Sequence, residues 1–388
     1  MIAPQWLERL LPSVEFEVNA VAAGLSAEGI AQIEQALASV VAAGKMAGAV
    51  TLISRNGKIA CHRAFGWRDR ESAATMRKDT IFRVLSVTKA VTCAALLALA
   101  DDNKLSLQDP VELYMPEFAG VRFADGRKPL NPPRIWQLMA HTAGLMDAFP
   151  SEFFHTDFTL ADVTGLTARS PLGYEPGMGW GYSNGGVAVV GRIIEKLSGT
   201  SYANFVRQRI LRPVGMNNSF FQVPANMRGR LAAIYRLSEG TLSRETDDPI
   251  NSNPKYISAE NGLHTTATDL WRFYEMIRNH GRVGNRQVLS EAHARAMVTV
   301  QTEDRDAGFL PGMGYGYGMS LVTAPNGIFR NHSAGTFGHG SYYQTHGWVD
   351  PTQGITGLLF CQNRADSMVV TEEVAQFVSL LGALRLIE

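Results

Sequence analysis

The apolar segment from Ala90 to Ala100 constrains the fold of this chain more than any other feature. It reads AVTCAALLALA and carries no charged side chain. A helix built from it is apolar on nearly every side, and such a helix is usually buried inside a protein. Lys89 stands directly before the segment, and lysines are rarely buried unless they have a partner. The sequence therefore predicts a buried helix that begins beside a partnered lysine.

Ser86 is the partner that the spacing offers to Lys89. Residues three apart on a helix lie on one face, about 5–6 Å apart at Cβ. Burial lowers the pKa of an amine, and a neutral amine beside a serine can activate it as a nucleophile. The pattern is short, and the chain repeats it in Ser252-Asn253-Pro254-Lys255. Because Pro254 would break the required helix, we expect the nucleophile to be Ser86.

Composition places the chain among ordinary globular proteins. Hydrophobic residues make up 45% and charged residues 19%, and 36 basic residues balance 36 acidic ones. This balance gives no indication of a nucleic-acid or anionic-membrane partner. The three cysteines show neither a disulfide framework nor zinc spacing, and we expect no metal and no cofactor. The chain begins without the pattern of a secretory signal and has no run long enough to span a membrane, so we expect a cytoplasmic protein.

Strand signals cluster at the two ends of the chain. A helix is expected from Ser26, which is a good N-cap. A hairpin is expected around Asn56-Gly57, with strands over 49–55 and 58–64. Later strands are expected in the ranges 316–322, 328–331, 341–349 and 355–361. A terminal helix is expected over 371–384.

Between these ends, residues 107–253 show short helical patches separated by proline and glycine. We therefore predict an α+β fold, in which helices flank an antiparallel sheet assembled from both chain ends. The predicted sheet domain comprises residues 1–107 and 258–388, and a mainly helical domain spans 108–257. The active site is expected at the interface of the two.

Gly181-Tyr182-Ser183-Asn184-Gly185 is the second candidate for chemistry. Tyr182 lies just before an apolar helix, where its hydroxyl can point into a cleft, although a surface turn would look the same. The segment also fits the Gly-x-Ser-x-Gly motif of α/β-hydrolases, which requires a strand before the serine. The preceding residues 171–180 contain two prolines and three glycines, which argues against a central strand and against Ser183 as the nucleophile.

A third candidate is the glycine-rich segment from Phe337 to Tyr343, which we expect to enter a strand. Glycines there would let the backbone approach a ligand closely. The backbone N–H of Tyr342, as a strand-edge donor, could join the N–H of Ser86 in an oxyanion hole. A glycine-rich turn leading into an edge strand is the alternative interpretation.

Taken in order, Ser86-x-x-Lys89, Tyr182-x-Asn184 and His339-Gly-Ser341 resemble the serine β-lactamase and penicillin-binding-protein superfamily. Further landmarks resemble its class C β-lactamase-like branch, which includes the family VIII carboxylesterases: 137–145, 175–177, 213–216, 261–263 and 347–351. The resemblance covers nearly the whole chain, from about residue 25 to 384.

The resemblance implies a role for each matching residue. Ser86 would be the acylated nucleophile, Lys89 would share or relay its proton, and Tyr182 would act as general base and then as acid. Asn184 would hold the carbonyl side of the substrate. Since Tyr and Lys ordinarily titrate near pH 10, one of the two pKa values must be lowered.

The segment His339-Gly340-Ser341 departs from the Lys-Thr-Gly of the β-lactamases. A histidine is mostly neutral at pH 7, so the predicted substrate-binding site lacks a fixed cation for a carboxylate, and Ser341 could narrow the approach to the acyl pocket. We therefore predict a carboxylesterase that acts on small esters. β-Lactam, D-amino-acid amide or D-peptide hydrolysis, acyl transfer, and an inactive binding protein are the alternatives.

His141 is expected to be a structural loop residue that could line the cleft. Six aromatic residues could shape an apolar acyl pocket, although most aromatic residues belong to cores: Phe149, Phe153, Phe154, Trp180, Tyr342 and Tyr343.

Overall fold

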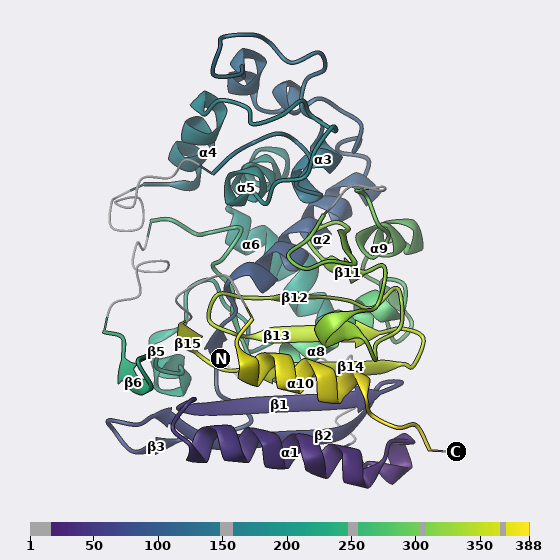
Figure 1. Ribbon diagram of the computed structural model, residues 1–388. Coiled ribbons are helices and arrows are strands. Elements are labelled where there is room, and N and C mark those ends of the chain that lie inside the picture. The colour runs from purple at the N-terminus through teal and green to yellow at the C-terminus, as the bar shows by residue number, and fades with distance from the viewer. Residues whose placement is uncertain (1–16, 148–157, 247–254, 303–306, 365–369, 388) are drawn as a thin grey trace, which may run out of the picture.

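An eight-stranded antiparallel sheet runs through the computed structural model, which describes residues 17–147, 158–246, 255–302, 307–364 and 370–387. The strands lie in the order β10-β11-β12-β13-β14-β1-β2-β3 (Figure 1). Their bounds are β1 Gly48–Arg55, β2 Lys58–Asp69, β3 Ala74–Thr75, β10 Met313–Tyr315, β11 Ser320–Val322, β12 Phe337–Gly340, β13 His346–Asp350 and β14 Ile355–Phe360.

The pairing of β1 with β14 joins the two ends of the chain. Val50 lies opposite Phe360, and the register continues to Arg55 opposite Ile355. On its other edge β1 forms the predicted hairpin with β2. Asn56 and Gly57 both have positive φ, of 49° and 80°, as the tight hairpin turn requires. The predicted α+β sheet built from both chain ends is confirmed.

Helices cover both faces of the sheet. Helices α1 (Ala27–Ala42) and α10 (Glu372–Gly382) pack against one another on one face, as Figure 1 shows in purple and yellow. As predicted, Ser26 caps α1 by accepting the N–H of Gly29. On the other face α8 (Ala267–Arg278) packs against β1 and β14.

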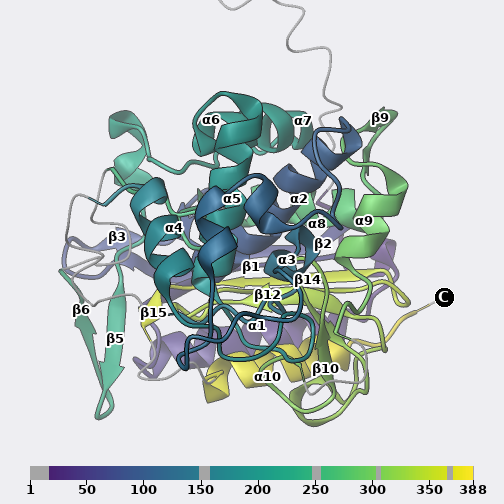
Figure 2. The same cartoon turned by 90° about the horizontal axis from the view of Figure 1, so that it is seen from above.

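In the view of Figure 1, helix α2 (Thr88–Asp101) lies between the sheet and the helices of residues 135–198, which Figure 2 shows from above. It is buried from Thr88 to Leu99, as its sequence predicts, and contacts α5, α6 and α9. The other helices are α3 Ile135–Met139, α4 Leu160–Arg169, α5 Asn184–Ser198, α6 Tyr202–Val206, α7 Arg212–Val214 and α9 Glu291–Met297. A π-helical turn, η7, spans Arg207–Leu211. Short 3₁₀ turns are η2 Val21–Ala23, η3 Leu85–Val87, η4 Val111–Leu113, η5 Pro116–Gly120, η8 Ala225–Arg230 and η9 Gly327–Phe329.

Residues 107–253 contain a hairpin that the helical prediction missed. Strands β5 (Tyr235–Ser238) and β6 (Thr241–Arg244) pair around Glu239-Gly240 and join β15 (Asn363–Arg364) in a small sheet. Glu239 and Gly240 have positive φ, of 49° and 76°, so this is again a tight hairpin turn. Two further pairs of two-residue strands are β4 Phe82–Arg83 with β7 His264–Thr265, and β8 Arg282–Val283 with β9 Arg286–Gln287.

The strand assignments between residues 313 and 350 need correction. The expected strand over 328–331 is wrong, because the 3₁₀ turn η9 begins at Gly327; β11 pairs instead with β10, through a turn that contains Gly318. Gly318 has a φ of 69°, and a Cβ there would lie 2.7 Å from the Lys89 carbonyl oxygen. The expected strand over 341–349 begins only at His346, and the preceding strand β12 ends at Gly340.

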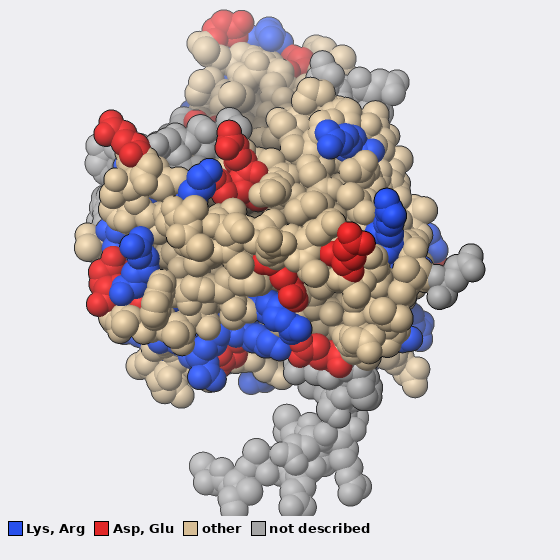
Figure 3. Space-filling view, turned by 60° about the horizontal axis from the view of Figure 1, so that its bottom comes forward, with Lys and Arg blue, Asp and Glu red and all other residues tan. Residues whose placement is uncertain are grey.

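Charges of both signs are interspersed on the face of the molecule shown in Figure 3. Within the described ranges, no helix has both the length and the apolar character to cross a membrane. No group of three or more His, Cys, Asp or Glu side chains is placed to hold a metal ion in that same part of the chain. The three cysteines are buried free thiols. The division into two domains stays a prediction.

Candidate active site

Ser86 lies in the short turn that leads into α2. Its turn, η3, begins at Leu85, which has a φ of 42°, a conformation that non-glycine residues seldom adopt. The Ser86 hydroxyl accepts a hydrogen bond from the Lys89 ammonium at 3.2 Å and donates one to Asn261 Oδ1 at 3.3 Å. The serine and the lysine that the sequence singled out are therefore in direct contact.

Lys89 is completely buried. Its ammonium also donates to the backbone carbonyl of Glu260 at 3.1 Å and lies 4.8 Å from the centre of the Tyr182 ring. Burial lowers the pKa of Lys89 to about 8, although the carboxylates of Glu260 and Asp147 oppose the change. An amine with this pKa exchanges its proton near neutral pH.

Tyr182 precedes α5 and faces the same space as Ser86. Burial raises its pKa above the ordinary value, and the nearby hydroxyl of Ser86 partly opposes that rise. The phenolic oxygen is buried without a full hydrogen bond to any described residue. Of the two groups expected to titrate near pH 10, Lys89 is the one whose pKa is lowered.

His141 holds the backbone on both sides of Tyr182. Its Nδ1 accepts the N–H of Ser183 at 3.1 Å, and its carbonyl oxygen accepts the N–H of Gly181 at 3.0 Å. Its ring lies 4.4 Å from the Tyr182 ring. Burial and the Lys89 charge hold the pKa of His141 well below its usual value. These contacts agree with the expected structural role of this residue.

Ser183 and Asn184 form the N-terminus of α5. The Ser183 hydroxyl accepts the N–H of Gly186 at 3.0 Å, so it caps the helix. The Asp147 carboxylate accepts the Asn184 side-chain amide at 2.8 Å, together with the backbone N–H groups of Asn184 and Gly185. This orientation leaves Asn184 Oδ1 buried without a partner among the described residues. A role for Asn184 in substrate binding stays a prediction.

His339 lies on β12 beside Tyr182, with 6.2 Å between the ring centres. Burial, and next the charge of Lys89, lowers the pKa of His339 to about 3, so the ring is neutral at neutral pH. Its Nδ1 is 2.5 Å from the Gly340 carbonyl oxygen and its Nε2 is 3.0 Å from the Tyr315 hydroxyl. Because a carbonyl can only accept, Nδ1 carries the proton and Nε2 accepts from Tyr315.

The residues that follow His339 depart from the expected strand. Ser341 is in a turn, where its hydroxyl accepts the N–H of Thr345 at 3.2 Å. Tyr342 is in the same turn, so its N–H is not the strand-edge donor that was expected. Its place in an oxyanion hole stays a prediction, and it does line the same cavity as Ser86.

That cavity has a volume of about 430 Å³, and Ser86 and Tyr182 both line it. His339, Gly340, Ser341 and Tyr342 line it, whereas Asn184, Trp180 and Tyr343 are not among its lining residues. The candidates Phe149, Phe153 and Phe154 lie outside the described residues, as do Ser252 and Pro254 of the second Ser-x-x-Lys pattern.

Sequence reasoning missed Glu260 and Tyr315. Glu260 is buried beside Lys89 and accepts the Tyr256 hydroxyl at 2.5 Å, while burial raises the pKa of its carboxyl. It occupies a loop with no periodic pattern. The only indication of a role in the site was its position directly before Asn261, which belongs to one of the landmarks of the resemblance. Tyr315 follows a glycine and reads as an ordinary strand residue.

The family model described as Beta-lactamase matches residues 33–378. Protein Rv1367c of Mycobacterium tuberculosis is 31% identical over 364 residues, covering 87% of this chain and 90% of that protein. Esterase EstB of Burkholderia gladioli is 30% identical over 377 residues, covering 89% of this chain and 93% of that protein. The solved structure of EstCE1, described as a hydrolase with promiscuous acyltransferase activity, superposes with a TM-score of 0.78. It is 24% identical, and the match covers 91% of this chain and 99% of that one.

Proposed function

Because this chain belongs to the beta-lactamase family, we propose that it is a serine hydrolase that cleaves carboxylic esters through an acyl-enzyme on Ser86. The observation that carries the proposal is the 3.2 Å contact between Ser86 and the fully buried Lys89. The pair opens, beside Tyr182, onto a cavity large enough for a small ligand. The similarity to an esterase, EstB, over nearly the whole chain supports the same activity.

In the proposed first half-reaction, Ser86 Oγ attacks the acyl carbon and its proton passes to neutral Lys89. The bond from the acyl carbon to the alcohol oxygen then breaks, and Tyr182 gives its proton to that oxygen. Lys89 returns a proton to Tyr182. The lowered pKa of Lys89 and the raised pKa of Tyr182 support this assignment of base and acid.

In the second half-reaction, water takes the place of Ser86 as the attacking group and the same proton transfers follow. The water attacks the acyl carbon and loses a proton to Lys89. The bond to Ser86 Oγ then breaks as Tyr182 gives its proton to the serine oxygen, and Lys89 returns a proton to Tyr182. The carboxylic acid leaves, and the enzyme returns to its starting state.

Esters are favoured over β-lactams and D-peptides because His339 is neutral. Those substrates carry a carboxylate, which a fixed cation would bind. His339 occupies the lysine position of the β-lactamase motif, and its pKa of about 3 leaves it uncharged.

The test compares the hydrolysis of p-nitrophenyl butyrate with that of nitrocefin, using Ser86→Ala as the blank. We expect ester turnover that depends on Ser86 and exceeds nitrocefin turnover by at least about a hundredfold in kcat/KM, the effect of losing one charged contact. Faster nitrocefin turnover would make the protein a β-lactamase. Ester turnover that survives in Ser86→Ala would refute the proposed nucleophile.

A further inference from the structure

The cavity that Ser86 lines also reaches the face of the sheet that α10 covers, because Ala375 of α10 and Trp348, which packs in the same hydrophobic cluster as α10, line it too. Part of its lining consists of apolar side chains from several elements, namely Leu310, Met313, Ile328, Phe329, Trp348 and Ala375. We call this part of the cavity the apolar chamber. Because it belongs to one cavity with Ser86 and Tyr182, a group bonded to Ser86 can reach into it.

The edge of β12 leaves room for this extension. Strand β11 pairs with β12 only at Phe337 and Gly338, so it does not cover His339 and Gly340. The His346 ring lies against Gly340, where a Cβ would come within 2.3 Å of it. A glycine at this point therefore lets the His346 ring form part of the chamber wall.

The described residues around the chamber carry no charge. No Lys, Arg, Asp or Glu is among the described residues that line the cavity. Its two histidines are neutral at neutral pH, because burial lowers the pKa of His339 to about 3 and that of His346 to about 4. A carboxylate or an ammonium group would lose its hydration there without gaining a charged partner among the described residues.

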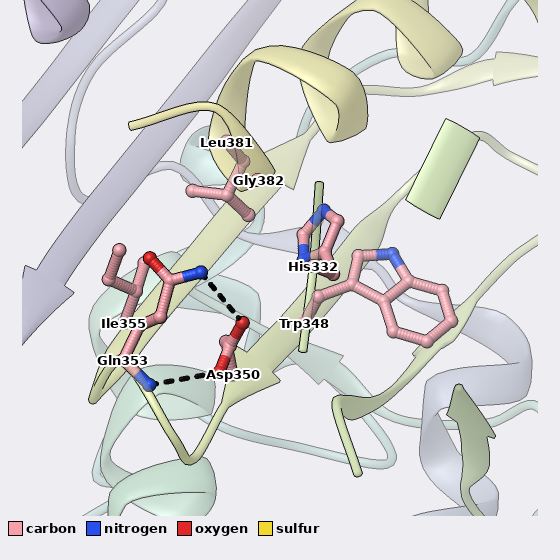
Figure 4. Close-up of a pocket in the computed structure, with 7 residues that line it drawn as sticks. All are labelled: His332, Trp348, Asp350, Gln353, Ile355, Leu381 and Gly382. Carbon is pink, nitrogen blue, oxygen red and sulfur yellow. Dashed lines mark hydrogen bonds between the residues drawn. The ribbon is translucent and has the colours of Figure 1, made fainter. Parts of the chain in front are cut away.

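The side of the chamber formed by Trp348 and Phe329, which we call its floor, is held in place by further contacts. The Trp348 indole packs edge-on against Phe329, with 4.7 Å between the ring centres. Figure 4 shows His332 beside Trp348, close to the C-terminal end of α10. His332 Nε2 donates to the Val378 carbonyl at 2.8 Å and so connects this group to α10. A fixed floor sets an upper limit on the length of an occupant.

We propose that the chamber binds the acyl group of the substrate, and that this group is an uncharged chain of about six to ten carbons. The inference rests on the proposed ester hydrolysis. The whole cavity, of which the chamber is one part, has a volume of about 430 Å³. At about 30 Å³ for a water-sized group it holds on the order of ten non-hydrogen atoms, and these include the ester group beside Ser86. The acyl group stays bonded to Ser86 after the alcohol has left, so a chamber in the same cavity as the nucleophile suits the acyl group, whereas the alcohol needs a path to solvent.

The first experiment measures kcat/KM for p-nitrophenyl acetate, butyrate, octanoate and tetradecanoate. Full burial of a methylene is worth about 0.8 kcal/mol, or about fourfold. At half that energy, about twofold per methylene, we expect octanoate to exceed acetate by at least about fiftyfold. Tetradecanoate should fall below octanoate, since the floor stops a longer chain.

Two further comparisons test the chemistry of the bound group. The first separates the effect of charge from that of chain length, and the second separates the effect of the acyl group from that of the alcohol. The p-nitrophenyl monoester of octanedioic acid has the length of octanoate and ends in a carboxylate; we expect it to react at least about a hundredfold more slowly than octanoate. Ethyl acetate and octyl acetate should differ by less than about threefold, because their variable part is the alcohol. A steeper alcohol series, or an acyl series without an optimum, would overturn the proposal.

Ala375→Leu narrows the chamber from α10, and Gln376→Leu adds the same side chain at the next, exposed position. We expect Ala375→Leu to lower the ratio of octanoate to butyrate kcat/KM by about tenfold and Gln376→Leu to leave it unchanged. Equal ratios in the two variants would refute the assignment. Ile328→Ala enlarges the chamber from another element and should raise the rate with tetradecanoate relative to octanoate.

These experiments distinguish failure of the inference from failure of the proposed function. If no ester reacts and a fluorophosphonate probe does not label Ser86, the proposed function is wrong. If esters react and Ser86 is labelled, but the rate is independent of acyl length, only the acyl chamber is wrong.

Discussion

Helices α2 and α5 both begin at the candidate site beside a serine, but the two serine oxygens have different partners. At α5 the Ser183 oxygen accepts the N–H of Gly186, and the Asp147 carboxylate accepts two more N–H groups of the first turn. At α2 no side chain of the described residues caps the helix, and the Ser86 oxygen contacts Lys89 and Asn261 instead. An oxygen that caps a helix stabilises the fold, whereas an oxygen beside a buried amine is available for chemistry.

The largest expected effect comes from exchanging each serine for alanine. Ser86→Ala should lower kcat for p-nitrophenyl butyrate by at least about 10⁴-fold, because it removes the nucleophile, and should leave the melting temperature nearly unchanged. Ser183→Ala should lower the free energy of unfolding by about 1 kcal/mol, the usual value of a cap, and retain most of the activity. Kinetics and thermal unfolding of both variants measure the contrast. Loss of activity in Ser183→Ala with normal folding would make Ser183 the nucleophile.

The next effect concerns Asp147, which organises the first turn of α5. Asp147→Asn should lower the free energy of unfolding by roughly 1–3 kcal/mol, because several N–H donors lose a charged acceptor. It should also lower kcat/KM by about tenfold, since Tyr182 directly precedes the disturbed turn. Chemical denaturation and ester kinetics check the two parts. An unchanged kcat/KM would show that the turn does not position Tyr182.

A smaller effect is expected in the pH dependence. If neutral Lys89 is the base, kcat/KM should rise with pH and reach half of its plateau near pH 8, where burial places the pKa of Lys89. Because the Glu260 carboxylate raises that pKa, Glu260→Gln should move the midpoint to lower pH. Glu275→Gln is the matched control, since Glu275 is also buried but contacts Arg278 and Thr356.

The pH profiles of wild type and both variants between pH 5 and 10 decide the matter, because that range extends well to both sides of the Lys89 pKa of about 8. Equal midpoints in all three proteins would show that Glu260 does not act on Lys89.

The smallest effect should follow from the cap of α1, which lies on the opposite face of the sheet. Ser26→Ala removes the acceptor of the Gly29 N–H and should cost about 1 kcal/mol of unfolding free energy. Because α1 contributes no residue to the cavity, kcat and KM should not change. A kinetic change in this variant would mean that capping and catalysis are not separable in this chain.

The sequence predicted the elements whose signals are local. Asn56-Gly57 predicts a hairpin turn because both residues tolerate positive φ, and Ala90–Ala100 predicts a buried helix because it lacks charge. Ser86 and Lys89 were predicted to touch because helical spacing alone brings them together, and they do. The β5–β6 hairpin was missed because its strands are short and its turn, Glu239-Gly240, is a weaker signal.

Contacts between residues far apart in the chain could not be predicted from local sequence patterns. Glu260 approaches Lys89 only in the folded chain, and nothing in its own loop indicates that contact. The apolar chamber was missed for the same reason, because α10 contributes Ala375 to it and β13 contributes Trp348. The predicted aromatic pocket wall therefore included Trp180 and omitted Trp348.

The most direct test of the account is the mass of the protein after rapid mixing with p-nitrophenyl octanoate and acid quench. We predict that the intact protein gains one octanoyl group, that the peptide containing Ser86 carries it, and that Ser86→Ala gains nothing. An octanoyl group on Ser183 or on any other residue, with ester turnover intact, would contradict the central claim that Ser86 is the nucleophile.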